Sequence, residues 1–183
     1  EPGVVAWTGR GTVTVGNWRA DGGDAANDPA GDDPAARVAA AFRAASVDAA
    51  VDPDIRRRLR VKLAVNAAIN PTTALARVRN GAVRSEPIAT YAERAAREAA
   101  AVARAEGVDV DGDVAVDRAL AVADRTADNR SSMLQDVAAG RRTEVDAISG
   151  AVAERAAAHG VDAPVNGLLA ALLRGWEAGR GLR

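Results

Sequence analysis

The stretch Arg58-Leu-Arg-Val-Lys62-Leu-Ala-Val-Asn66-Ala-Ala-Ile-Asn70-Pro71 contains the one lysine among the 24 basic residues of the chain. Arginine stays protonated at any accessible pH, whereas a partly desolvated lysine can release a proton. A chain that uses arginine for its other positive charges and keeps a lysine in an apolar stretch therefore indicates that an ammonium is needed there. We interpret Lys62 as a candidate general acid.

Residues 54–69 have the periodicity of a helix. Its apolar arc, drawn at about 100° per residue, contains Ile55, Leu59, Leu63 and Ile69. Lys62, Asn66 and Asn70 fall inside the same arc, so we expect polar groups on the buried face. Burying an unpaired amide costs about 1–3 kcal/mol, and burying an unpaired ammonium costs more. The pattern therefore predicts a polar cleft, a ligand or dedicated partners.

Each of these positions also has an ordinary structural interpretation. Lys62 could extend along the edge of the helix face and place its ammonium in water. Asn70 precedes Pro71 and is typical of the N-cap of a following helix. Asn80 precedes Gly81, a common turn pair. The hydroxyls of Ser131 and Ser132 break the helical run and are typical of an N-cap, and Glu144 stands at a predicted helix start, where a carboxylate offsets the helix dipole.

The rest of the chain after Asp54 is also helical in pattern. The first helix is interrupted at Asn70-Pro71, and Thr143-Glu-Val-Asp146 resembles a capping box with aspartate as its last residue. Gly150 inside a helix predicts a close helix crossing. Cap and turn signals delimit further helices at about 71–80, 87–107, 112–128, 131–139, 143–160 and 167–178.

The first 52 residues have a different composition. We expect a hairpin over 3–18, a loop over 19–33, a helix over 34–46 with Asp33 as its N-cap, and a short strand over 47–51. These elements cannot bury a core by themselves, so they are typical of the end of a larger sheet. We therefore divide the chain into residues 1–52 and a helical domain over 53–183.

Composition excludes several classes of function. Hydrophobic residues make up 48% of the chain and aromatic residues 3%, so alanine dominates the apolar content and favours closely packed helices. The absence of cysteine and the single His159 exclude a thiolate site and predict no metal centre. A net charge of −1, with charges of both signs interspersed, gives no basic surface of the kind that binds nucleic acid. No apolar run is long enough for a membrane span, so we expect a cytoplasmic protein.

Several motifs together resemble those of the ketopantoate reductases (2-dehydropantoate 2-reductases). The resemblance is carried by Lys62-Leu-Ala-Val-Asn66-Ala-Ala-Ile-Asn70-Pro71, Asn80-Gly81, Ser131-Ser132-Met-Leu-Gln-Asp136, Gly140-Arg141-Arg-Thr143-Glu144-Val-Asp146 and Gly150. It implies a mainly α fold, with a multi-helix C-terminal domain of the 6-phosphogluconate dehydrogenase-like type after a small α/β remnant of a Rossmann NADP-binding domain. It also implies NADPH-dependent reduction of ketopantoate to (R)-pantoate on the route to pantothenate and coenzyme A.

The resemblance also implies roles for individual residues. Lys62 matches the proton donor of the family. Residues that match its substrate contacts are Asn66, Asn70, Asn80 and Ser132. Glu144 matches a residue that contacts the cofactor. Where the family often has tryptophan two positions before the lysine, this chain has Arg60.

One part of the family pattern is missing from this sequence. No Gly-x-Gly-x-x-Gly follows a predicted strand, and the chain starts at Glu1 with Met133 as its one methionine. We therefore expect an N-terminally truncated fragment that is inactive and binds NADPH poorly alone. Two alternatives stay open, a non-catalytic helical module that forms a dimer or docks on another protein, and a reductase of another 2-keto acid.

Overall fold

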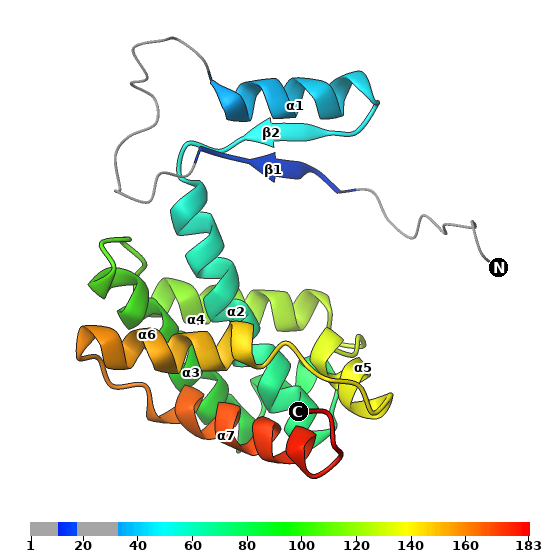
Figure 1. Ribbon diagram of the computed structural model, residues 1–183, viewed down its shortest axis with the longest axis vertical. Helices are drawn as coiled ribbons and strands as arrows, with labels where there is room; N and C mark the ends of the chain where they lie inside the picture. The colour runs from blue at the N-terminus through cyan, green and yellow to red at the C-terminus, as the bar shows by residue number, and fades with distance from the viewer. Residues whose placement is uncertain (1–10, 18–32) are drawn as a thin grey trace, which may run out of the picture. The chain divides into compact units, whose positions relative to one another are not determined.

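The computed structural model describes residues 11–17 and 33–183, and the chain divides into two compact units, Glu1–Arg58 and Leu59–Arg183 (Figure 1). The first run of the predicted hairpin, most of the predicted loop, Trp7 and Trp18 lie outside the described residues. Helices make up most of the rest, so the predicted mainly α class is confirmed.

The described part of the first unit is a small βαβ arrangement. Strand β1 (Val13–Val15) is followed by α1 (Pro34–Ala44) and β2 (Ala49–Val51). The two strands are parallel, with Val13 opposite Ala49 and Val15 opposite Val51. Parallel neighbours need a crossover, and α1 provides it by packing along both strands (Figure 1). Such a unit is a small part of the sheets that Rossmann folds build.

The start of α1 follows the sequence prediction. An Asp33 side-chain oxygen accepts a hydrogen bond from the amide of Ala36 at 3.0 Å, and Pro34 occupies the first turn, where no amide hydrogen is needed. Asn17 joins this cap to β1, because its side-chain oxygen accepts from the amide of Ala35 at 3.0 Å and its amide donates to Asp33 at 2.8 Å. The predicted N-cap is therefore confirmed.

The helical unit is built from six α-helices joined by short single-turn segments. In chain order the elements are α2 (Ile55–Ala76), the 3-10 turn η2 (Asn80–Arg84), α3 (Ile88–Ala105), α4 (Gly112–Arg125), α5 (Ser132–Ala138), the π turn η3 (Asp146–Gly150), α6 (Ala151–His159) and α7 (Pro164–Ala178). Figure 1 shows α3, α4, α6 and α7 grouped around the C-terminal half of α2.

Alanine forms much of the buried core of this unit. On α3 the fully or almost fully buried positions recur every three or four residues, and they include Ala92, Ala95, Ala96, Ala99, Ala100 and Ala103. Such small side chains let neighbouring helices approach closely. Larger residues fill the remaining space, above all Met133 and Leu173, each 1% exposed. The packing predicted from composition is therefore the packing observed.

The helix predicted to stop at Asn70-Pro71 continues through both residues, so this prediction was wrong. Pro71 lies inside α2 and has no amide hydrogen for the preceding turn. The next two residues, Thr72 and Thr73, form additional side-chain hydrogen bonds within the helix. Thr72 Oγ1 donates to the carbonyls of Ala68 and Ile69, and Thr73 Oγ1 to that of Ile69 at 2.7 Å. None of these bonds reaches the carbonyl of Ala67, which loses its amide donor at Pro71, so the close packing of the buried residues 67–74 is what keeps the helix continuous.

Among the described helices, none has the length and apolar character required to span a membrane.

Candidate active site

Three polar side chains follow one another along α2 at intervals of four residues. Lys62 is exposed, Asn66 is half-buried and Asn70 is 9% exposed. Four residues advance a helix by about 400°, so each step shifts the side chain by about 40° around the axis. The row therefore drifts from the solvent edge at Lys62 toward the core at Asn70. The expectation that all three lie on the buried face was wrong for Lys62.

Lys62 and the two asparagines keep their polar side-chain atoms available. Among the described residues, neither the ammonium of Lys62 nor the side-chain amides of Asn66 and Asn70 form a hydrogen bond or ion pair. The alternative N-cap role of Asn70 does not apply, because Asn70 lies in the middle of α2. An ammonium and two amides with free hydrogen-bonding capacity therefore follow one helix over about 12 Å.

A buried pair of hydroxyls connects this row to α5. Thr73 Oγ1 and Ser131 Oγ are 2.8 Å apart, and Ser131 Oγ also accepts a hydrogen bond from the amide of Leu134 at 3.1 Å. Either hydroxyl can donate in this bond, and Thr73 Oγ1 also lies 2.7 Å from the carbonyl oxygen of Ile69. Ser131 is thus the N-cap of α5. Ser132 follows it as the first residue of that helix, and its side chain is exposed.

Asn80 is held by the same loop that leads to Ser131. Its backbone amide donates to the carbonyl of Asn129 at 3.0 Å, and its side-chain amide donates to Thr126 Oγ1 at 3.0 Å. Asn80 Oδ1 is buried and accepts no hydrogen bond from the described residues. A buried carbonyl oxygen without a partner costs about 1–3 kcal/mol, so it is expected to meet a ligand or a water molecule. Gly81 lets the chain pack closely against Ala127 in the same loop, since a Cβ at position 81 would lie 3.0 Å from Ala127 Cβ.

Glu144 lies exposed on the turn before η3, in a segment fixed from α7. Glu177 is fully buried, and its Oε1 accepts hydrogen bonds from Thr143 N at 2.7 Å and Thr143 Oγ1 at 2.6 Å. Burial by itself would raise the pKa of Glu177, but the Thr143 bonds and the Arg183 guanidinium outweigh it and hold the pKa below its ordinary value. The predicted capping box was therefore wrong, because Glu177 and not Asp146 accepts from the amide of Thr143.

Asp146 instead gathers three guanidinium groups. Arg142, Arg174 and Arg183 place nitrogens 3.3, 2.8 and 2.6 Å from its carboxylate oxygens. Gly150, where a close helix crossing was predicted, lies against the end of the Arg174 side chain, since a Cβ there would lie 2.6 Å from Arg174 Nη2.

Hydrogen bonds connect the segments that carry some of the predicted site residues. Thr73 on α2 bonds to Ser131, next to Ser132, and Asn80 bonds to Thr126 and Asn129 in the loop before Ser131. Lys62, Asn66 and Asn70 lie on α2. Among the described residues, no side-chain hydrogen bond or ion pair connects Glu144 to them. Nor does any group of three or more His, Asp or Glu side chains in these ranges have an arrangement suited to a metal ion.

Sequence reasoning missed Thr73 and Glu177 as residues that position the site. Thr73 follows a helix-interior proline and looks like an ordinary helix residue, while Glu177 looks like a charge on the solvent side of the last helix. Neither has a local sequence signal, because each acts on a partner far away in the chain, Ser131 and Thr143 respectively.

Known sequences and structures resemble this chain over most of its length. The family described as "Ketopantoate reductase PanE/ApbA C terminal" matches residues 54–177. The 2-dehydropantoate 2-reductase of Halobacterium salinarum is 46% identical over 95% of this chain and 54% of its own length. That of Pyrococcus abyssi is 34% identical over 97% of this chain and 56% of its own length. The chain thus spans about half the length of these relatives.

Solved structures agree with the sequence matches. A PanE/ApbA family ketopantoate reductase from Ralstonia eutropha has a TM-score of 0.77 and 31% identity, covering 95% of this chain and 54% of that one. D-mandelate dehydrogenase in complex with NADH has a TM-score of 0.79 at 22% identity, covering 93% of this chain and 56% of that one, which shows a shared fold. The match over residues 54–177 includes every one of the candidate site residues. The chain belongs to the ketopantoate reductase family.

Proposed function

We propose that this chain supplies the substrate-binding and proton-donating part of an NADPH-dependent 2-dehydropantoate 2-reductase, which reduces ketopantoate to (R)-pantoate for pantothenate and coenzyme A synthesis. The observation that carries the proposal is the row of Lys62, Asn66 and Asn70 on α2, with polar side-chain atoms that have no partner among the described residues. Fold alone would not carry it, since related folds host different substrates.

The proposed chemistry assigns a task to each side chain. Nicotinamide supplies a hydride when bound. Negative charge then grows on the keto oxygen, and the Lys62 ammonium stabilises that charge and donates the proton. Lys62 suits this task because it is exposed and unpaired among the described residues, so it need not break an ion pair to meet a ligand.

The amides and the serine orient the substrate. Asn66, Asn70 and Asn80 each offer a donor and an acceptor, which suits a small acid with hydroxyl, keto and carboxylate oxygens. Asn80 Oδ1 is buried without a partner and therefore gains an acceptor bond when a substrate hydroxyl reaches it. Ser132 adds an exposed hydroxyl at the start of α5.

Glu144 is the residue of this chain that we assign to the cofactor. Its exposed carboxylate, on a turn held by Glu177, fits a hydrogen-bond acceptor for a group such as an amide or a ribose hydroxyl. A glycine-rich phosphate-binding motif is not part of this sequence. NADPH binding and turnover therefore belong to the chain combined with a complete Rossmann domain.

The test is NADPH oxidation with ketopantoate by the protein that carries this chain behind a complete Rossmann domain. Lys62→Ala and Lys62→Arg are expected to lower kcat by about 10²–10⁴-fold with little change in KM, because proton transfer is lost while substrate contacts stay. Arg58→Ala, which removes another exposed cation of α2, is the matched control. Turnover by Lys62→Ala within twofold of the wild type would remove Lys62 from the mechanism. A panel of other 2-keto acids tests the substrate.

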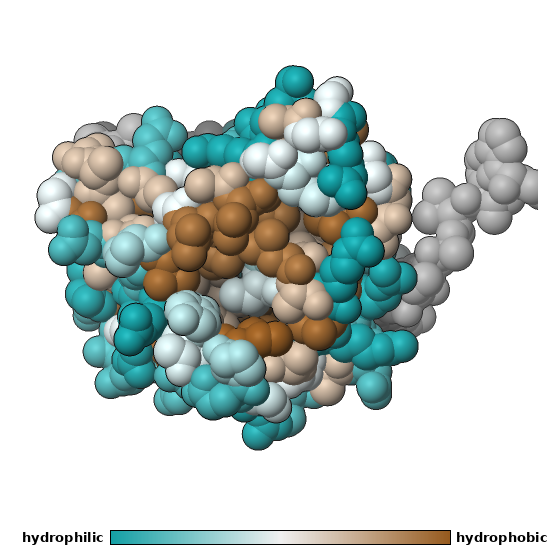
Figure 2. Space-filling model, turned by 90° about the horizontal axis from the view of Figure 1, so that it is seen from below, coloured by the Kyte–Doolittle hydropathy of each residue, from teal (hydrophilic) through white to brown (hydrophobic). Residues whose placement is uncertain are grey.

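A second proposal concerns self-association. An apolar hollow of about 260 Å³ is lined by residues of α2, α3 and α7, and Figure 2 shows apolar side chains gathered around a hollow on one face. Leu168 and Leu172 on α7 are 56% and 50% exposed, which is unusual for large apolar residues that stay in water. A ketopantoate reductase from Staphylococcus aureus with the same fold is described as dimeric.

We propose that a second copy of the chain covers this face. Sedimentation should show a dimer for the wild type and a monomer for Leu168→Ser combined with Leu172→Ser. A monomeric wild type at all concentrations would contradict the proposal. Turnover of the double variant, measured behind a complete Rossmann domain, is expected to stay at the wild-type level, because neither leucine is a proposed site residue.

A further inference from the structure

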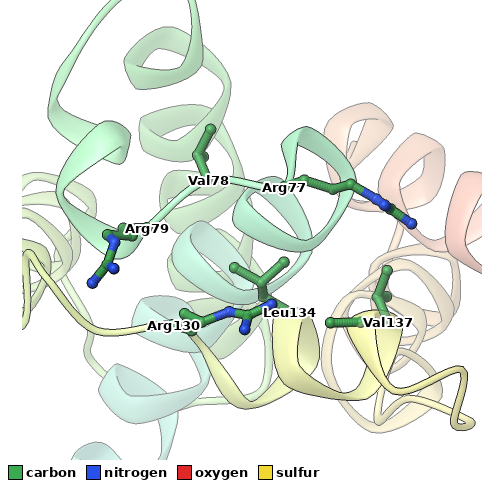
Figure 3. A pocket seen from close by; sticks show the side chains of 7 residues that line it. Arg77, Val78, Arg79, Arg130, Leu134 and Val137 are labelled. Carbon is green, nitrogen blue, oxygen red and sulfur yellow. The ribbon is translucent and has the colours of Figure 1, made fainter.

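A second cavity lies between the end of α2 and α5. It has a volume of about 400 Å³, within the range of small-molecule sites. Val78, Leu134 and Val137 contribute apolar surface, and Arg77, Arg79 and Arg130 contribute charge. Figure 3 shows Arg130 lying beside Leu134, while Arg77 and Arg79 stand at the two ends of the segment across the cavity. None of Asn66, Asn70, Asn80 and Ser132 lines it.

The charge of this cavity is unbalanced. Among the described residues its lining contains three arginines and no carboxylate, in a chain whose net charge is −1. Arg79 donates to the backbone carbonyl of Asp128 and forms no ion pair with a described carboxylate. The side chains of Arg77 and Arg130 form no hydrogen bond or ion pair with another described residue. The nearby carboxylate of Asp136 is already bound to Arg141, at 2.7 Å.

Arg77 has an unusual backbone conformation. It directly follows Ala76, the last residue of α2, and has a φ of 56°, in the left-handed region where glycine is the usual residue after a helix. The amide of Val78 bonds to the carbonyl of Thr73 at 3.1 Å, which completes the C-terminal cap. Glycine adopts this φ at a lower conformational cost, so Arg77→Gly would remove the guanidinium without straining the turn.

We propose that this cavity binds a small organic anion, a carboxylate or a phosphate monoester attached to a compact apolar body. The Arg130 guanidinium, which lies beside Leu134, meets the anionic end, and Leu134, Val137 and Val78 cover the apolar part. Figure 3 shows the Arg77 side chain pointing away from Arg130, so Arg77 turns toward the cavity when the anion binds. The site goes beyond the proposed reductase activity, because its lining residues are distinct from the substrate residues and its test measures binding without turnover.

Occupancy would bridge two segments that carry proposed substrate residues. Arg79 directly precedes Asn80, and Arg130 lies two residues before Ser132. An anion held by both sides therefore fixes the spacing of these segments and links the cavity to the reductase site.

Calorimetric titration of the 183-residue chain with three matched probes tests the proposal. The probes are 1-naphthyl phosphate, 1-naphthoate and 1-naphthol, which share one apolar body and differ in the charged group. At least one anion should bind with one-to-one stoichiometry and at least tenfold more tightly than naphthol, and more weakly as salt is raised. The tighter anion identifies the phosphate or the carboxylate as the preferred group. Equal affinity for naphthol, or no binding by either anion, would overturn the proposal.

Variants then place the ligand. Arg130→Gln and Arg77→Gly should each weaken anion binding by about tenfold, the loss expected for one charged hydrogen bond. Arg77→Gly is the sharper of the two, because glycine suits a φ of 56° and the fold should be as stable as in the wild type. Arg94→Gln on α3 removes the same charge elsewhere, and Leu168→Ser alters the other hollow; both should bind normally. Unchanged binding by both cavity variants, or loss on Leu168→Ser, would refute the site.

Discussion

At the scale of single residues, Asp146 pairs with three arginines, and the local sequence around it does not predict this cluster. Burial alone would raise the pKa of its carboxyl, but hydrogen bonds from Arg183, Arg174 and Arg142 outweigh that effect and lower the pKa from 3.8 to about 2. A group whose folded pKa lies below its unfolded value stabilises the fold above the unfolded pKa. That contribution disappears as the pH falls through the folded pKa.

The stability of the chain should therefore decline between about pH 4 and pH 2 in a way that depends on Asp146. Urea unfolding at pH 7, 4 and 2.5 is the measurement. The decline should be shallower for Asp146→Asn, although Glu177, whose pKa is also lowered, keeps part of it. Asp117→Asn on the exposed side of α4 is the matched control and should follow the wild type. Identical pH profiles for Asp146→Asn and the wild type would contradict this account.

At the scale of elements, the contact between α2 and α5 depends on a pair of hydroxyls. Thr73→Val keeps the shape of the side chain but leaves the buried Ser131 hydroxyl without its side-chain partner on α2. We expect a loss of about 1–3 kcal/mol in the free energy of unfolding, measured with urea.

Thr72→Val is the matched control for this substitution. The Thr72 hydroxyl bonds only to carbonyls of its own helix, so its loss should cost less than about 1 kcal/mol. Equal losses in the two variants would show that the bond between α2 and α5 adds nothing of its own.

The crossing of η3 and α7 makes a second prediction at this scale. Gly150→Ala should be destabilising, because the new Cβ would lie 3.2 Å from the backbone carbonyl oxygen of Val145 and would push the Arg174 side chain, which is paired with Asp146, out of its place. Gly167→Ala on α7 has no atom within 4 Å of the new Cβ and should stabilise by up to about 1 kcal/mol. Thermal unfolding of the two variants should therefore shift in opposite directions. A shared direction would mean that helix propensity, and not the close approach, decides the effect at Gly150.

At the scale of the whole molecule, the helical unit contains its own core. Every buried member of the main apolar cluster lies between Ala64 and Leu173. Stability of a compact unit depends chiefly on such a core.

A chain that begins at Asp54 should therefore unfold cooperatively at nearly the same urea concentration as the 183-residue chain. Circular dichroism follows the helices in both. A non-cooperative transition or a large loss of helical signal in the shorter chain would show that residues 1–53 contribute to the stability of the helical unit.

Much of the local structure was predictable because its causes lie within a few residues. Asp33 caps α1, Ser131 caps α5, and Gly107, Gly140 and Gly160 end helical runs with φ values of 77°, 66° and 65°. The row of Lys62, Asn66 and Asn70 was likewise visible as a spacing of four. The burial of that row was not, because the drift of about 40° per step matters only once the position of the core is known.

The sequence by itself determined the helical class, most helix ends and the identity of the candidate polar groups, since propensity, capping and periodicity act over short distances. Tertiary structure decided which of these groups meet. Glu98 on α3 accepts hydrogen bonds from the amides of Val165 and Asn166 at 2.9 Å each and so caps α7, a helix without a local cap. Glu177 on α7 likewise accepts from the amide of Thr143, a residue far away in the chain. Packing of the buried residues around Pro71 lets α2 continue through it. The physical reason is that a buried donor takes whichever acceptor packing brings within reach, and packing depends on the whole chain.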